Sequence, residues 1–453
     1  MQNITCLVIL ALVLPGSPGN QYLNNYQIMI ALIALIFVAG YAAITLEHTI
    51  KINKAATALI TGVLCWSLFA LHSADKEIPV HILGEHLGEV AGILFFLLGA
   101  MTIVELIDAH DGFEIITSRI QTTSKRKLIW ITAFITFFLS AVLDNLTTTI
   151  VMVSLLRKLL SERKERLLFA GLIIIAANAG GAWSPIGDVT TTMLWIGGQI
   201  TTGAIIMQTI IPSIICLLIP TIIISLRVKG SFQRVAAEVH NRNFTYNKRQ
   251  RNTVFCLGVG SLLFVPVFKT ITHLPPYMGI LFGLGLMWCV TELIHHGKDE
   301  EEKGLLSVNH ALRKIDTPSV LFFLGILLSI AALQATGILG NVAGWMDRTI
   351  GNIEVITVAI GLLSAVVDNV PLVAAAQGMY SMDQFPTDHY FWEFLAYCAG
   401  TGGSALIIGS AAGVAAMGME RIEFFWYLRH VSWLALLGYL GGAAAFLLQH
   451  MIM

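Results

Sequence analysis

The chain has 453 residues, of which 56% are hydrophobic and only 12% are charged, and its mean hydropathy is +0.76. An ordinary soluble protein carries about twice that charged fraction, so this class is excluded. The composition predicts an all-α polytopic membrane protein, in which the positions of the charges matter more than their formal sum of −1.

Residues 1–26 are predicted to form a signal-like or peripheral N-terminal segment. Residues 4–14 are apolar but too few to span a bilayer, and PGSPGN follows them. No Lys or Arg precedes the apolar run, although a secretory signal peptide usually has one there. A cleaved signal and a short peripheral helix both remain open.

Apolar stretches long enough to cross a membrane follow along the rest of the chain. Each has about 17 residues or more, and they cover 27–46, 54–71, 89–107, 204–226, 253–271, 278–294, 318–338 and 430–447. Two longer regions, 167–195 and 391–418, are interrupted by runs of small residues. Such runs are typical of a helix that unwinds and restarts around a cavity.

The apolar regions 127–160 and 353–382 are each interrupted at the midpoint by an Asp-Asn pair. If both regions are re-entrant hairpins, 24 of the 27 basic residues lie on one side of the membrane, which the positive-inside rule makes the cytoplasm. If both crossed the membrane instead, the basic loop 157–166 would lie outside. The charge distribution therefore favours hairpins.

An internal repeat joins these features. ILFFLLGAM matches VLFFLGILL, SAVLDN matches SAVVDN and NAGG matches GTGG, at offsets of 227, 224 and 222 residues. Each half, 27–226 and 253–453, then has five crossings and one hairpin, and a basic cytoplasmic linker, 227–252, joins them. Because five is odd, the halves are inverted repeats, which is the architecture of secondary transporters with a site near the midplane.

The hairpin tips carry the strongest candidates for chemistry, Asp144-Asn145 and Asp368-Asn369. An aspartate at the centre of a bilayer costs roughly 2.5–3.5 kcal/mol on insertion scales, so two at matching positions call for a function. Each Asp could cap the second helix of its hairpin. We expect them also to bind a cation or a proton, with the asparagines supplying uncharged oxygens.

These tips, together with the segment VELIDAHDGF at 104–113, resemble those of NhaD-type sodium/proton antiporters, within the ion transporter superfamily. The resemblance covers nearly the whole chain from about residue 27. It implies sodium-binding residues at Ser140, Asp144, Asn145, Ser364, Asp368 and Asn369, and unwound helices at Gly180, Gly181, Ser184, Pro185 and 401–404. It further implies a homodimer and an elevator-like motion of the hairpin domain.

For several other polar residues, both a structural and a functional role remain open. Asp188 either caps the restarted helix or completes the site, with Ser184 and the threonines at 190–192 as hydroxyl partners, and Asn178 either packs or binds. Glu105 and Asp108 belong to a proton pathway or simply reach water at a helix end.

Other titratable residues are expected to need no special role. The histidines at 110, 295, 296 and 310 are expected in solvated loops, and Glu393 near the outer face. The six cysteines have no metal-site or disulfide spacing.

The sequence predicts a sodium or lithium/proton antiporter of the bacterial inner membrane, with no cofactor, no enzyme activity and no nucleic-acid partner. Burial disfavours the charged form of a carboxylate, so sodium and protons can compete for the same oxygens while the site alternates between the two sides. Transport should therefore rise towards alkaline pH. The alternatives are a sodium-coupled carboxylate or oxyanion transporter of the same fold and, more remotely, an intramembrane aspartyl protease with a carboxyl dyad.

Overall fold

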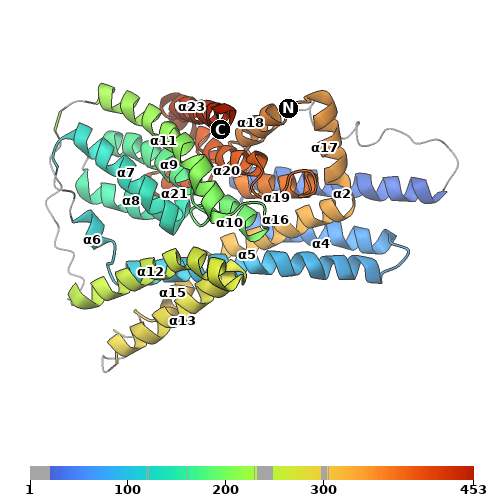
Figure 1. Cartoon of the computed structure of the whole chain (residues 1–453), viewed down its shortest axis with the longest axis horizontal. Helices are drawn as coiled ribbons and strands as arrows, with labels where there is room; N and C mark the ends of the chain where they lie inside the picture. Colours follow the sequence, from blue (N-terminus) through green and yellow to red (C-terminus); the bar gives the residue numbers. More distant parts are fainter. Residues whose placement is uncertain are drawn as a thin grey trace. The chain divides into compact units, whose positions relative to one another are not determined.

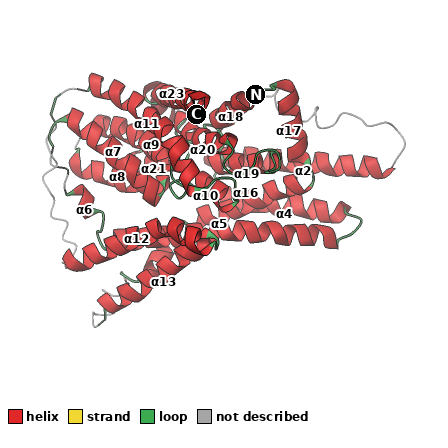
Figure 2. Cartoon of the chain, in the orientation of Figure 1, coloured by secondary structure: helices red, strands yellow, loops and turns green. Residues whose placement is uncertain are grey.

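The computed structural model describes residues 21–452 apart from 119, 121, 161, 229, 232–247, 297–303 and 305. Over this part of the chain Figure 2 shows helices and loops and no strand, and an isolated bridge joins Ser124 to Ser231. The predicted all-α class is confirmed. The apolar run 4–14 and most of the linker 227–252 lie outside the described residues.

The helices of the first half of the chain are coloured from blue to green in Figure 1. They are α2 (Gln21–Thr45), α3 (Glu47–Ile50), α4 (Lys54–His72), α5 (Glu77–Ala109), α6 (Glu114–Thr117), α7 (Lys125–Leu143), α8 (Asn145–Leu159), α9 (Arg163–Gly181), α10 (Val189–Ile196) and α11 (Thr202–Arg227).

The helices of the second half run from yellow-green to red in the same figure. They are α12 (Lys248–Thr272), α13 (Pro276–Ile294), α15 (Val308–Lys314), α16 (Thr317–Ala335), α17 (Ile338–Thr349), α18 (Ile353–Leu363), α19 (Asn369–Met379), α20 (Tyr390–Gly402), the 3-10 turn η1 (Gly403–Ala405), α21 (Ala411–Glu420), α22 (Phe424–His430) and α23 (Ser432–Ile452).

Nine helices among the described residues are long and apolar enough to cross a membrane: α2, α4, α5, α7, α11, α12, α13, α16 and α23. Large apolar side chains on them are exposed, such as Val63 on α4 and Ile271 on α12. An exposed apolar face on a helix of this length is a face for lipid. The chain is thus a multi-pass membrane protein.

Helix α5 differs most from its predicted span, because it begins at Glu77 rather than at residue 89. Its first three turns mix apolar residues with Glu77, His81, Glu85 and His86, so they form no continuous apolar run. Side chains one turn apart support them, since His81 lies 3.6 Å from Glu85 and His86 lies 3.5 Å from Glu89.

The described chain divides into two compact units that both draw on the two sequence halves. The first comprises residues up to 94 with 316–356 and 370–385, and the second comprises 95–315, 357–369 and 386–453. In the first unit α4 packs against α2 and α16. Gly62 and Gly325 let the backbones of α4 and α16 approach closely, and Trp66 Nε1 donates to the Leu328 carbonyl at 2.8 Å.

The second unit holds the interrupted helices. Within it α7 and α8 pack against α9, α21 packs against α8 and α9, and α11 packs along α23. A buried apolar cluster unites these helices, including Phe137 of α7, Ile173 of α9 and Tyr439 of α23. The hairpin tips and both helix breaks therefore share one core.

Two histidines that were expected in solvated loops are instead buried against each other in this second unit. The Nε2 atoms of His110 and His295 are 2.8 Å apart, and the rings stack with centroids 5.1 Å apart. The Nδ1 atom of His110 donates to the Leu106 carbonyl at 2.7 Å. The expectation was wrong because the two histidines are 185 residues apart, and only tertiary packing brings them together.

Candidate functional site

The first broken helix stops at Gly181 and restarts at Val189. The turn between them is tied to its surroundings by hydroxyl groups: Ser184 donates to the Ala141 carbonyl at 2.6 Å, and Thr192 donates to the Pro185 carbonyl at 3.0 Å. A helix end leaves carbonyls without intrahelical partners, and Ala141 lies at such an end. The turn is therefore fixed to the tip of the first hairpin.

Asp188 is the residue on which the two hairpin tips converge. It is 2% exposed and caps α10, because its Oδ1 accepts from the backbone N–H and the hydroxyl of Thr190, both at 2.9 Å. Its Oδ2 accepts from Asn145 Nδ2 at 2.6 Å, and both oxygens lie 3.4 Å from Asn369 Nδ2. One buried carboxylate is thus held by an amide from each tip.

Asn178, on the last turns of α9, extends this network into the second half of the chain. Its Oδ1 accepts from Asn145 Nδ2 at 3.1 Å. Its own Nδ2 donates to the hydroxyls of Ser404 and Ser410, each at 2.9 Å. All of these side chains are buried. The hydrogen bonds join two hairpins and two helix breaks into one polar cluster.

Asp144 plays a different part from Asp188. Its carboxylate accepts from the backbone N–H and the hydroxyl of Thr147, both at 2.8 Å, so it caps α8. Its backbone φ angle is +93°, a value that residues other than glycine rarely adopt. The prediction that Asp144 caps the second helix of its hairpin is confirmed. The strained backbone at this residue fixes the corner of the hairpin.

The second hairpin repeats the contacts of the first. Ser140 donates to the Ala177 carbonyl at 2.6 Å, and Ser364 donates to the Ala399 carbonyl at 2.8 Å. The residue that caps the restarted helix is Asp188 in one half and Ser410 in the other. The scaffold is therefore repeated, while the carboxylate is found at only one of the two equivalent caps.

Two glycines allow each hairpin to approach its broken helix closely. A Cβ atom at Gly180 would meet the carbonyl oxygen of Phe137, and one at Gly402 would meet the carbonyl oxygen of Gly361. No residue with a side chain fits there without a backbone shift. Each hairpin thus touches its broken helix through main-chain atoms.

The electrostatics of this cluster are dominated by acidic groups. Asp188 lies within electrostatic range of Asp144 and Asp368, and its described hydrogen-bond donors are amide, hydroxyl and backbone groups. Among the described residues no three His, Cys, Asp or Glu side chains gather as metal ligands. A cation here would therefore draw on amide, hydroxyl and carbonyl oxygens around a carboxylate, which suits a hard monovalent ion.

The far end of α10 is also anchored. Lys269 of α12 donates to the Trp195 carbonyl at 2.6 Å and lies 4.5 Å from the centroid of the Trp195 ring. A cation at a helix C-terminus is favourable because the last carbonyls carry partial negative charge. The short helix is thus held at both ends.

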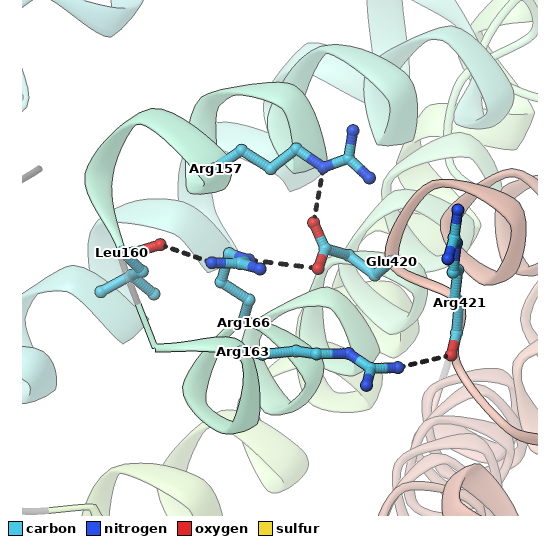
Figure 3. Close-up of polar contacts among 6 residues, drawn as sticks. All are labelled: Arg157, Leu160, Arg163, Arg166, Glu420 and Arg421. Carbon is cyan, nitrogen blue, oxygen red and sulfur yellow. Dashed lines mark hydrogen bonds and ion pairs between the residues drawn. The ribbon is translucent and has the colours of Figure 1, made fainter. Parts of the chain in front are cut away.

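Away from the tips, α8, α9 and α21 are joined by the cluster in Figure 3. Buried Glu420 accepts from Arg157 Nε at 2.7 Å and from Arg166 Nε at 3.1 Å. Arg166 also donates to the Leu160 carbonyl, and Arg163 donates to the Arg421 carbonyl. Three helices that reach the site at one end are therefore tied together at the other.

The chain is similar in sequence to known membrane transporters. Residues 28–400 match the family described as "Citrate transporter". "Sodium/proton antiporter 1" of Arabidopsis thaliana is 49% identical, covering 99% of this chain and 77% of that protein. "Na(+)/H(+) antiporter NhaD" of Vibrio cholerae serotype O1 is 30% identical, covering 94% and 93%. The chain belongs to this family, among its NhaD-type members.

In this NhaD-type chain the predicted site residues fall into two groups. Asn145 and Asn369 each donate to Asp188, with Asp144 and Asp368 in electrostatic range of it. The hydroxyls of Ser140, Ser364 and Ser184 instead donate to backbone carbonyls, as does Thr401, which bonds to Tyr397 one turn away. The first group surrounds the carboxylate, and the second holds the backbone that carries it.

The predicted proton-pathway residues, Glu105 and Asp108, belong to a different helix, α5. Glu105 pairs with Lys314 at 3.1 Å, and its side chain is 23% exposed. The Glu105–Lys314 pair includes no residue of the Asp188 cluster.

Sequence reasoning gave too little weight to three residues of the network: Asn178, Ser404 and Ser410. The repeat offset of 222 residues was available, and it pairs Asp188 with Ser410. Aligning single residues at this offset, and not only motifs, indicates that Ser410 caps the second restarted helix. The bonds that Asn178 makes to both serines depend on tertiary packing and left no local signal.

Proposed function

We propose that this protein is a secondary active antiporter that exports sodium or lithium ions in exchange for protons. The observation that carries the proposal is Asp188, a buried carboxylate held by the amides of Asn145 and Asn369. A charged group in such surroundings is costly unless it is neutralised. The names of the relatives, which include sodium/proton antiporters from plants and bacteria, support the same exchange.

Competition between a cation and a proton at Asp188 provides the coupling. The amides of Asn145 and Asn369 now donate to the carboxylate, but each also carries a carbonyl oxygen that can turn towards a cation. Asp144, Asp368 and the serine and carbonyl groups near them would complete the oxygen ligands. Sodium leaves when protons neutralise the carboxylates, and the gradients of the two ions drive the cycle without a cofactor.

The repeated contacts support an inverted-repeat arrangement with alternating access. Under this proposal the hairpins 127–160 and 353–382 enter from opposite faces, and the broken helices 167–195 and 391–418 complete the two repeats. A homodimer in the bacterial cytoplasmic membrane belongs to the same proposal. The mass of the purified protein in detergent measures the oligomeric state.

The deciding experiment is the dissipation of a pH gradient in proteoliposomes, followed by dequenching of an acid-sensitive dye. We expect sodium and lithium, but not potassium, to dissipate the gradient in the wild type, with activity rising towards alkaline pH as protons compete less well. Asp188→Asn should abolish the response, because a neutral amide cannot exchange the two ions. Asp144→Asn and Asp368→Asn should each reduce it.

The control is Glu423→Gln, which alters an exposed glutamate outside the cluster and should behave like the wild type. Sodium binding should also be measured in purified protein from acidic to alkaline pH. An affinity that stays constant over that range would contradict competition, and full exchange by Asp188→Asn would remove the carboxylate from the mechanism.

A sodium-coupled carboxylate carrier is the second candidate, because the matching family is described as a citrate transporter. A carboxylate substrate needs cationic or donor groups, whereas the cluster described here gathers Asp144, Asp188 and Asp368. Adding citrate separates the two functions. Sodium flux that depends on citrate would favour the carrier, and flux that requires only a proton gradient would favour the antiporter.

A further inference from the structure

Glu393 lies inside the second unit in a position unlike that expected from its sequence. It belongs to the first turns of α20 and is fully buried, at 0% exposure. Neither carboxyl oxygen has a hydrogen-bond partner among the residues that the structure describes. The expectation that Glu393 needs no special role rested on its predicted place near the outer face, and full burial contradicts that ground.

An ionised carboxylate in this position would be costly. Burying a charge without a partner costs far more than burying a neutral acid, so such a group takes up a proton. A glutamine would fill the same volume without titrating. The presence of an acid therefore needs a reason beyond packing.

The helix that carries Glu393 also leads to the cation site. Gly400 lies seven residues further along α20, and a Cβ atom built there would lie 3.8 Å from Asp188 Oδ2. Seven residues are nearly two turns, so Glu393 and Gly400 occupy the same helix face about 10 Å apart along the axis. On the other side of Glu393, the exposed Asp388 lies only five residues away.

Titratable groups are found on the loop before α20 and on the helices that pack against it. The loop before α20 contributes His389 and Asp388, whose carboxylate accepts from Thr201. Helix α23 contributes His450, stacked on Tyr390, and Tyr439, whose carbonyl accepts from Tyr397. Helix α11 contributes Cys216, close to Tyr397. Helix α10 brings only Asp188 at its start, and the charged residues of α9 lie at its other end.

No Lys or Arg is among these surrounding groups of the described chain. Acidic Asp388 opposes a negative charge on Glu393, burial lowers the pKa of His389, and the aromatic and thiol groups are neutral near pH 7. The surroundings therefore favour a protonated Glu393, which loses its proton only when a base or water reaches it.

We infer that Glu393 is a second proton-binding site of the transporter, placed on α20 between the surface at Asp388 and the cation site at Asp188. In the structure described here it holds its proton, and during transport it releases that proton and takes up another. The inference rests on the proposed antiport and adds to it a residue outside the hairpin tips.

Infrared difference spectroscopy of the purified protein tests the inference directly. A protonated carboxylic acid has a C=O stretching band that shifts in D2O. We expect the wild type to show a band that is missing from Glu393→Gln and that disappears as the pH is raised. A wild-type spectrum identical to that of Glu393→Gln, or a band that persists throughout the range in which the protein stays folded, would overturn the inference.

The pH profile of sodium-driven exchange gives a second readout. Glu393→Gln, which mimics the protonated acid, should keep the fold and lose one titration step, so that its profile is less steep than that of the wild type. Glu393→Asp should restore the step. An unchanged profile in Glu393→Gln would overturn the inference, with Glu423→Gln as the control for an exposed site.

The infrared titration needs no transport. If wild-type vesicles show no sodium/proton exchange, the proposed function fails, while the titration still reports whether Glu393 binds and releases a proton.

Discussion

Asp144 and Asp188 both cap helices, yet their partners suit them to different tasks. Both oxygens of Asp144 are taken up by Thr147, and its φ of +93° holds the corner of the hairpin. Asp188 shares its carboxylate with the side-chain amides of Asn145 and Asn369. A side-chain amide can turn its oxygen inward, whereas a backbone N–H cannot. Under the proposed function, ion exchange therefore falls to Asp188, while Asp144 shapes the tip.

Substitution of Asp144 should separate capping from charge. Asp144→Ala should lower the free energy of unfolding by about 1 kcal/mol through the lost cap, and further because alanine disfavours a positive φ. Asp144→Asn should stay close to the wild type, since asparagine caps helices and tolerates positive φ. Thermal unfolding in detergent, followed by tryptophan fluorescence, measures the difference. Equal melting temperatures for Asp144→Ala and the wild type would contradict the capping role.

Some of this cluster was readable from the sequence. The Asp-Asn pairs were visible because a carboxylate is rare in an apolar run, and the helix breaks because small residues accumulate there. The central place of Asp188 was not visible, since it depends on Asn369, 181 residues away. The burial of Glu393 could not be predicted for a related reason: neighbouring helices bury it, and the local sequence does not show which helices these are.

Helices α8, α9 and α21 work as a set. The first begins at Asn145, the second carries Asn178 near its end, and the third begins directly after Ser410. Their opposite ends meet at Glu420, which accepts from Arg157 and Arg166 (Figure 3). Because each helix is a stiff rod, fixing one end sets the position of the other. The Glu420 cluster thus positions polar groups that it does not touch.

Removing this link should affect both stability and transport. Glu420→Ala leaves Arg166 without its buried partner and should cost about 2 kcal/mol, the value of a hydrogen bond to a charged group. It should also raise the sodium concentration needed for half-maximal exchange, because the ends of α8 and α21 lose their register. The matched control is Glu423→Ala, an exposed glutamate three residues away. Equal melting temperatures and sodium dependence in the two variants would show that the cluster has no positioning role.

At the scale of the whole molecule, the contacts between hairpin and broken helix occur in both halves, but the cap is a carboxylate in only one of them. The predicted spans correspond closely to helices, for example 204–226 to α11 and 54–71 to α4, because apolar length is a strong signal. The grouping of segments into two compact units, each taken from both halves, was not predicted. It depends on packing between helices that are distant in sequence.

Exchanging the cap residues Asp188 and Ser410 tests whether the two helix breaks are functionally equivalent. Asp188→Ser alone should abolish sodium/proton exchange. Adding Ser410→Asp should restore part of it, because Asn178 Nδ2 already donates to residue 410 and could donate to a carboxylate there. Dequenching in proteoliposomes compares the single and double variants at equal protein content. If the double variant is as inactive as the single one, the two caps are equivalent in backbone only.

The glycine contacts at residues 180 and 402 have a consequence for how such a protein can change over time. Where hairpin and broken helix meet, main-chain atoms set the fit, so the geometry of the polar cluster is largely independent of which apolar side chains surround it. The lipid-facing surface can then drift among Leu, Ile, Val and Phe without disturbing the cluster. Under the proposed function, new ion preferences would have to arise from the few polar side chains within it.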